Sequence, residues 1–184
     1  MHCLFTFLAA VSVASPALPP APPAAAAAPY AACWTKYSDG QATDSRGKSS
    51  VDNGEITYDD STSLDGALSY AVRAWGFGKI KIRKDDSASY ADLEFKDTNR
   101  TDGAWAGRYG HWESGPGTDV IWLNHAYLLS ASTQQMIAAH ELGHALGFCH
   151  KDYRTYATLM APHTGDMASA PTAQDTKNYT ALWG

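Results

Sequence analysis

The residues between 140 and 150 carry three histidines at spacings that suit a single metal ion. His140 and His144 are four residues apart, so on a helix both imidazoles leave the same face, one turn apart. Gly147 can adopt the positive φ at which a helix ends and the chain reverses, and the reversal brings His150 back toward the other two. Three imidazoles with a fourth position left for water are a typical ligand set of catalytic zinc. The spacing therefore predicts that His140, His144 and His150 bind one catalytic Zn²⁺ ion.

A carboxylate beside the first ligand supplies the base that such a site needs. Zinc lowers the pKa of a bound water to about 7, and Glu141 directly follows His140. Its carboxylate is placed to accept the proton of that water and pass it to a leaving amine. Burying these polar side chains unpaired on an otherwise apolar helix would cost several kcal/mol, which favours metal binding over a core role. We therefore expect zinc-dependent hydrolysis of peptide bonds, with Glu141 as general base and acid.

Hydrophobic periodicity predicts the elements that position these residues. Apolar residues recur at helical spacing from Leu64 to Trp75, with Gly76 after them, which predicts an amphipathic helix. Alternation of apolar and polar residues predicts strands at 55–58, 79–83 and 91–95. The more continuous apolar run 119–124 predicts an interior strand.

Two further helices are expected in the second half of the chain. The helix with the zinc ligands should run from 133 to about 146, with Ser132 as its N-cap and Gln135 as the capping-box partner. The final helix should begin at the cap pair Thr172 and Asp175. The ligand helix is apolar on most sides, so we expect it to be buried.

The motif around the ligands and the segment after it resemble one family. Residues 140–150 read H-E-x-x-H-x-x-G-x-x-H, and Met160 follows in Thr-Leu-Met-Ala-Pro at 158–162, where it is expected to form an apolar floor under the zinc. This combination resembles the zinc motif and Met-turn of metzincin metallopeptidases. Residues 91–95 are similar to the third strand of matrixins. Residues 172–184 are similar to the closing helix of matrixins and of snapalysins, which are small secreted proteases.

The resemblance implies an α+β fold of the zincin type. It would have a twisted, mixed five-stranded sheet, an active-site helix, a Met-turn and a C-terminal helix. By this analogy the antiparallel edge strand that pairs with an extended polypeptide substrate lies between Asp102 and Arg108, and the wall of the specificity pocket lies between Pro162 and Gly165. The substrate-binding residues implied by the resemblance are Gly103, Ala104, Trp105, Pro162 and His163.

The N-terminal residues differ in composition from the rest. Residues 1–14 contain a short apolar run that ends in small residues, which predicts a secretory signal peptide; the run is shorter than the roughly 20 residues that span a membrane. Residues 15–32 form a Pro/Ala-rich linker, and residues 33–184 have the size of one catalytic domain. We expect a secreted, extracellular monomer. The net charge of −5 argues against nucleic acid or a membrane surface as a partner.

Two cysteines remain after the predicted signal peptide. In an exported protein Cys33 and Cys149 are expected to form a disulfide. The alternative is that the thiolate of Cys33 occupies the open zinc position and keeps the enzyme latent. The Pro-Arg-Cys-Gly type of sequence that would favour latency does not surround Cys33.

Other interpretations of the chain stay open at this level. It could be a secreted zinc-containing module that binds protein without cutting it, or an amidase that acts on a non-protein substrate. His111 with Asp97 or Asp102 is a candidate for a lesser metal site, and Asp85 with Asp86 for Ca²⁺, although solvated loop residues explain both patterns. The roles of His125 and His163 are not determined by the sequence.

Overall fold

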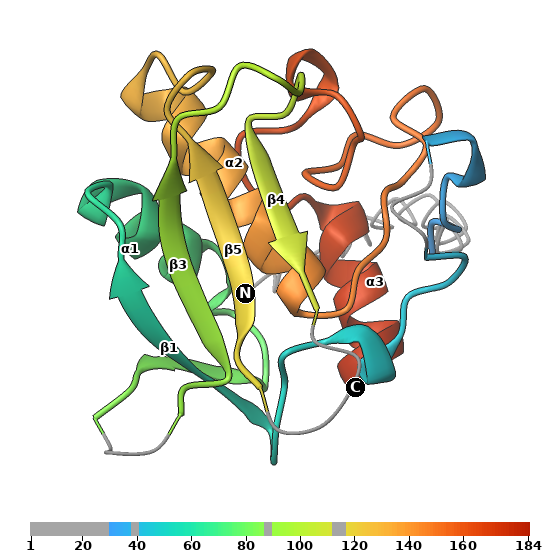
Figure 1. Cartoon of the computed structure of the whole chain (residues 1–184). Coiled ribbons are helices and arrows are strands. Elements are labelled where there is room, and N and C mark those ends of the chain that lie inside the picture. Colours follow the sequence, from blue (N-terminus) through green and yellow to red (C-terminus); the bar gives the residue numbers. More distant parts are fainter. Residues whose placement is uncertain (1–29, 38–40, 87–89, 112–116) are drawn as a thin grey trace, which may run out of the picture.

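The structure is a computed structural model that describes residues 30–37, 41–86, 90–111 and 117–184 (Figure 1). The predicted signal peptide at 1–14 and the predicted linker up to residue 29 lie outside these ranges. Ala31, at the end of that linker, is fully buried, so packed structure begins before Cys33. No helix in the described ranges combines the length and apolar character needed to cross a membrane.

In the part of the chain that the structure describes, five strands form one mixed sheet in the order β2-β1-β3-β5-β4 (Figure 1). Strands β2, β1, β3 and β5 run parallel, and β4 lies antiparallel to β5 at the edge. The α+β class with a mixed five-stranded sheet is confirmed, and so is the interior position of the run 119–124, because β5 has a neighbour on each side. The bounds are β1 (Glu55–Ser61), β2 (Lys81–Lys84), β3 (Leu93–Thr98), β4 (Gly107–Gly110) and β5 (Asp119–Asn124).

Among the described residues, three α-helices accompany the sheet, together with three short 3-10 turns. Helices α1 and α2 lie side by side on one face of the sheet, and α3 closes the chain below α2 (Figure 1). The α-helices are α1 (Asp65–Trp75), α2 (Ala131–Ala145) and α3 (Ala173–Trp183); the turns are η1 (Thr35–Tyr37), η2 (Arg46–Lys48) and η3 (Thr164–Asp166).

The core forms between the sheet and these helices because alternate strand residues face α1 and α2. Leu93 and Phe95 of β3 are fully buried, as are Ile121 and Leu123 of β5. Trp75, the last residue of α1, is also fully buried, and its indole N–H donates to the carbonyl of Ala139 in α2 at 2.7 Å. The ligand helix is thereby held against the molecule by packing on one side and a buried hydrogen bond on the other.

The helix starts were predicted with mixed success. Thr172 and Asp175 form the predicted capping box of α3. The predicted cap of α2 is wrong: Ser130, not Ser132, is the N-cap, and its hydroxyl accepts from the backbone N–H of Thr133 at 3.2 Å. Ser130 has the extended backbone that an N-cap requires (φ −134°, ψ 151°), whereas Ser132 already lies in the first turn.

The predicted edge strand overlaps β4 in only two residues. The sequence placed it at Asp102–Arg108, but β4 begins at Gly107. The preceding residues are held as a loop by the buried amide of Asn124, which donates to the carbonyls of Arg100 and Trp105 at 2.9 Å each. The side-chain amide of Asn124 thus takes the carbonyl of Trp105, while its backbone N–H takes the carbonyl of Ala106.

Candidate functional site

The three histidine rings of the zinc motif converge on one point. His140 and His144 project from the last two turns of α2, and their Nε2 atoms are 3.1 Å apart. The Nε2 atom of His150 lies 3.2 Å from that of His144 and 3.3 Å from that of His140. The structure therefore brings together the three residues that the sequence singled out, and two of them, His140 and His144, are buried.

Gly147 makes this convergence possible. Its φ is +90°, a conformation that side-chain-bearing residues rarely adopt. A Cβ at this position would also lie 2.4 Å from the carbonyl oxygen of Ser45. Both the turn and the close approach require glycine, as the motif predicted.

Backbone carbonyls set the protonation of two of the rings. The Nδ1 atom of His140 donates to the carbonyl of Leu159 at 2.8 Å, and that of His144 donates to the carbonyl of Phe148 at 2.7 Å. A carbonyl oxygen can only accept, so the proton of each neutral ring is on Nδ1 and the lone pair is on Nε2. Burial, reinforced by the neighbouring charge of His150, lowers the pKa of His144 to about 3. His144 is therefore neutral at any physiological pH, as a metal ligand must be.

The separations of the three nitrogens fit a tetrahedral zinc ion. With Zn–N bonds of about 2.0–2.1 Å, tetrahedral ligands lie about 3.3 Å from one another. The observed Nε2 separations are 3.1, 3.2 and 3.3 Å. The Nε2 atoms of His140 and His144 present lone pairs to each other and cannot share a proton, so a cation bound between them would make the arrangement favourable.

Glu141 lies beside this cluster, close to the edge strand. Glu141 is 5% exposed, and a Cβ added at Gly107 of β4 would lie 2.6 Å from its Oε1 atom. The absence of a side chain at Gly107 therefore leaves the space that the carboxylate occupies.

A cleft of about 820 Å³ opens over the histidines and Glu141. Its lining includes β4 with the residues just before it, helix α2 and the segment after the Met-turn. Four of the five predicted substrate-binding residues line it, namely Ala104, Trp105, Pro162 and His163. Gly103 stands one residue outside this lining and packs against the ring of Trp105.

Met160 lies beneath the ligand helix. It is 1% exposed, and a Cβ added at Gly143 would come within 2.4 Å of its sulfur. Since Gly143 stands between His140 and His144, the methionine packs on the turn of α2 that carries both ligands. This contact agrees with the apolar floor that the sequence predicted.

Asp175 has a role that the sequence revealed only in part. Besides completing the α3 capping box, its carboxylate accepts from the backbone N–H of Leu159 at 2.9 Å and from the hydroxyl of Thr158. Leu159 is the residue whose carbonyl orients His140. Sequence spacing could identify the cap, but nothing local indicated that the same carboxylate reaches the Met-turn.

Two of the remaining histidines lie beside carboxylates. His111 lies 3.0 Å from the buried carboxylate of Asp119, not beside Asp97 or Asp102. His125, in turn, lies 3.2 Å from Asp97. Strand register brings His111 and Asp119 together, because Gly110, the last residue of β4, is paired with Val120, the second residue of β5.

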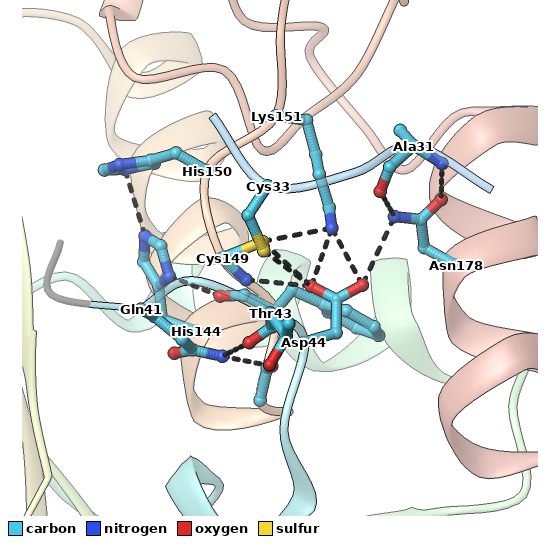
Figure 2. The surroundings of a disulfide bond; sticks show 12 residues. Ala31, Cys33, Gln41, Thr43, Asp44, His144, Cys149, His150, Lys151 and Asn178 are labelled. Atoms are coloured by element: carbon cyan, nitrogen blue, oxygen red, sulfur yellow. Dashed lines mark hydrogen bonds and ion pairs between the residues drawn. A yellow bond between two sulfur atoms is a disulfide. The ribbon is translucent and has the colours of Figure 1, made fainter. Parts of the chain in front are cut away.

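The disulfide between Cys33 and Cys149 is present, with a Cα–Cα distance of 5.6 Å (Figure 2). Cys33 is therefore not a free thiolate, which excludes the latency alternative. Within the described ranges, one other group of three possible metal ligands exists besides the histidines. It consists of Cys33, Cys149 and Asp44, and its two sulfurs are bonded to each other. Asp86, considered for Ca²⁺, lies 3.5 Å from the guanidinium of Arg83.

Comparison with protein-family models gave no match to the chain, and comparison with curated proteins gave none either. The functional assignment below therefore depends on the residues and their geometry.

Proposed function

We propose that this chain is a secreted zinc endopeptidase of the metzincin type. The observation that carries the proposal is the convergence of three imidazole Nε2 atoms within 3.1–3.3 Å of one another, beside a buried glutamate in an open cleft. The mixed five-stranded sheet and the packing of Met160 against helix α2 are compatible with it. His140, His144 and His150 would hold the zinc ion, and Met160 would support the helix beneath them.

When bound there, zinc would act as a Lewis acid that makes a water molecule reactive at neutral pH. Glu141 then has the position of the base, because it borders the same cleft one residue after the first ligand. Its carboxylate would accept the proton of the attacking water and deliver it to the nitrogen of the departing amine. A single carboxylate can serve both steps, since it is protonated in the first and deprotonated in the second.

The edge strand supports an extended polypeptide as the substrate. Strand β4 pairs with β5 on one side and ends the sheet on the other, and the residues of β4 line the cleft. A peptide that adds to this edge would gain backbone hydrogen bonds without regard to its side chains. Gly107 at the point nearest Glu141 lets the backbone of such a peptide approach the carboxylate closely.

The test compares cleavage of a reduced and alkylated protein by the zinc-loaded wild type and by Glu141→Ala. We expect equal zinc content and a loss of rate of at least about 10²-fold in the variant, the lower end of the usual contribution of a general base. If both proteins bind one zinc and neither cuts, the chain is a zinc-containing binding module or an amidase on a non-protein substrate. If the wild type binds no zinc, the metal centre itself is wrong.

A further inference from the structure

The loop that carries the third histidine is held by the N-terminal part of the domain. We call residues 146–151 the ligand loop. The backbone N–H of Ser45 donates to the carbonyl of Gly147 at 2.9 Å, and that of Trp34 donates to the carbonyl of His150 at 2.8 Å. Backbone hydrogen bonds therefore join the ligand loop to residues more than 100 positions earlier in the chain.

Asp44 is the centre of these contacts (Figure 2). One carboxylate oxygen accepts from the backbone N–H of Cys149 at 3.0 Å, and the two oxygens lie 2.7 and 2.8 Å from the ammonium of Lys151. The second oxygen also accepts from the amide of Asn178 in α3 at 3.3 Å. Cys149 and Lys151 are the two residues that flank His150, so one side chain ties the chain on both sides of the third ligand.

Burial makes this link strong and specific. The side chain of Lys151 is 1% exposed and that of Asp44 is 13% exposed. An ammonium so deeply buried must keep its carboxylate partner, because an unpaired buried charge is strongly unfavourable. The backbone N–H of Lys151 is fixed as well, since it donates to the carbonyl of Met160 at 2.7 Å. The position of the His150 backbone therefore depends on Asp44.

We propose that Asp44 is a positioning residue of the metal centre: by binding Cys149 and Lys151 it holds His150 where it completes the ligand set. His140 and His144 come from one helix and are already ordered by their Nδ1 hydrogen bonds. His150 comes from a loop, and ordering a loop costs conformational entropy at the moment of binding. Because Asp44 orders the loop before the metal binds, removing Asp44 should lower the affinity for the metal. The inference rests on the proposed metal centre but not on catalysis.

The experiment measures zinc affinity by competition with a chromophoric chelator, under conditions that keep the disulfide intact. The variants are Asp44→Ala and a control, Asp92→Ala. Asp92 also accepts two hydrogen bonds, from the backbone N–H and the hydroxyl of Thr57 at 2.7 and 2.8 Å, but it lies at the start of β3. We expect Asp44→Ala to bind zinc at least about tenfold more weakly, and Asp92→Ala to bind it as the wild type does.

Asp44→Ala leaves Lys151 buried without its partner and could unfold for that reason alone. The double variant Asp44→Ala/Lys151→Met removes both charges and should restore the stability, but it still lacks the acceptor for Cys149. We expect its zinc affinity to stay low and the visible spectrum of its Co²⁺ form to differ from that of the wild type, because the third ligand is displaced.

The outcomes separate the two proposals. Wild-type affinity in a folded double variant would show that Asp44 serves stability only and would overturn the inference. Failure of the wild-type protein to bind one zinc would overturn the metal centre instead. Tight zinc binding by the wild type without proteolysis leaves the Asp44 test intact, since its readout is affinity.

Discussion

At the scale of single residues, the site depends on the lack of a side chain at Gly107 as well as on the carboxylate of Glu141. Adding a methyl group at Gly107 would bring carbon within 2.6 Å of the Oε1 atom of Glu141 and 2.5 Å of a methyl of Ile137. Both contacts are too short, so the carboxylate or the strand must move. A displacement of about 1 Å at such a site can cost on the order of 10²-fold in rate.

Gly107→Ala should therefore lower kcat. The zinc content should be unchanged, because the atoms nearest to the added methyl group belong to Ile137 and Glu141 and not to a histidine. Steady-state proteolysis and metal analysis of the same preparation check this. Gly66→Ala is the matched control: an added Cβ there has no atom within 4 Å, and in helix α1 alanine should stabilise by about 0.5–1 kcal/mol. Unaltered kcat in Gly107→Ala would mean that the carboxylate of Glu141 is not confined by β4.

The buried ring of His144 predicts how the metal-free protein responds to acid. Burial lowers its pKa from the ordinary 6.5 to about 3, so between these values the unfolded chain binds a proton that the folded chain does not. Stability must then fall as the pH is lowered from about 6.5 toward about 3. Urea midpoints measured with a chelator at several pH values should show this decline.

The control for the acid response is His144→Gln, which removes the titrating ring. Its urea midpoints should decline less steeply over the same pH range. An identical slope in the two proteins would assign the acid response to other groups.

At the scale of elements, helix α3 is coupled to the ligand helix through the Met-turn. The carboxylate of Asp175 caps α3 and also binds Leu159, whose carbonyl holds the Nδ1 of His140. Such outer hydrogen bonds orient metal ligands and influence affinity. The closing helix is thus part of the support of the site, although it provides no ligand.

Asp175→Ala should lower both the stability and the zinc affinity, the latter by about tenfold or more. Thr172→Ala removes a hydroxyl that contacts the Asp175 carboxylate and the carbonyl of Ala157 but leaves the Asp175 carboxylate that binds Leu159. It should lower stability by about 0.5–2 kcal/mol and change the affinity much less than Asp175→Ala does. Urea unfolding and chelator competition provide the two readouts. If both variants change affinity equally, the effect comes from helix α3 as a whole and not from the carboxylate.

At the scale of the whole molecule, the disulfide joins two segments that are far apart in the sequence and meet beside His150. Cys33 and Cys149 are separated by 116 residues, and closing a loop of that length restricts the unfolded chain substantially. On the chain-entropy model the bond stabilises the domain by about 5 kcal/mol. The free energy of unfolding of a domain is usually about 5–15 kcal/mol, so a large share of it depends on this disulfide.

The double variant Cys33→Ser/Cys149→Ser should accordingly unfold at much lower urea concentration than the wild type. Adding a dithiol to the wild type should reproduce the shift, and adding it to the variant should have no effect. A dithiol effect of equal size on the variant would show that reduction of this bond is not the cause.

Local spacing alone carries the chemistry proposed for this chain. The offsets of His140, Glu141, His144, Gly147 and His150 specify which side chains share a helix face and where the chain reverses, because helix periodicity and glycine conformation are local properties. The capping box of α3, helix α1 and the main strands followed from equally local patterns. Each element was expected in the right part of the chain, but with bounds that differ by up to three residues, as for β2 (79–83 expected) and β3 (91–95 expected). Ser130 rather than Ser132 caps α2.

Only the tertiary structure decided which distant groups support that chemistry. Asp44, Asp175 and Asn124 act on residues far away in the sequence, and Asp119 meets His111 through the register of two strands. Their partners depend on how the sheet, the helices and the N-terminal residues pack together. The residues around a carboxylate in the sequence do not show which backbone N–H group it will bind. Spacing could therefore predict the proposed metal ligands, but not the side chains that hold them in place.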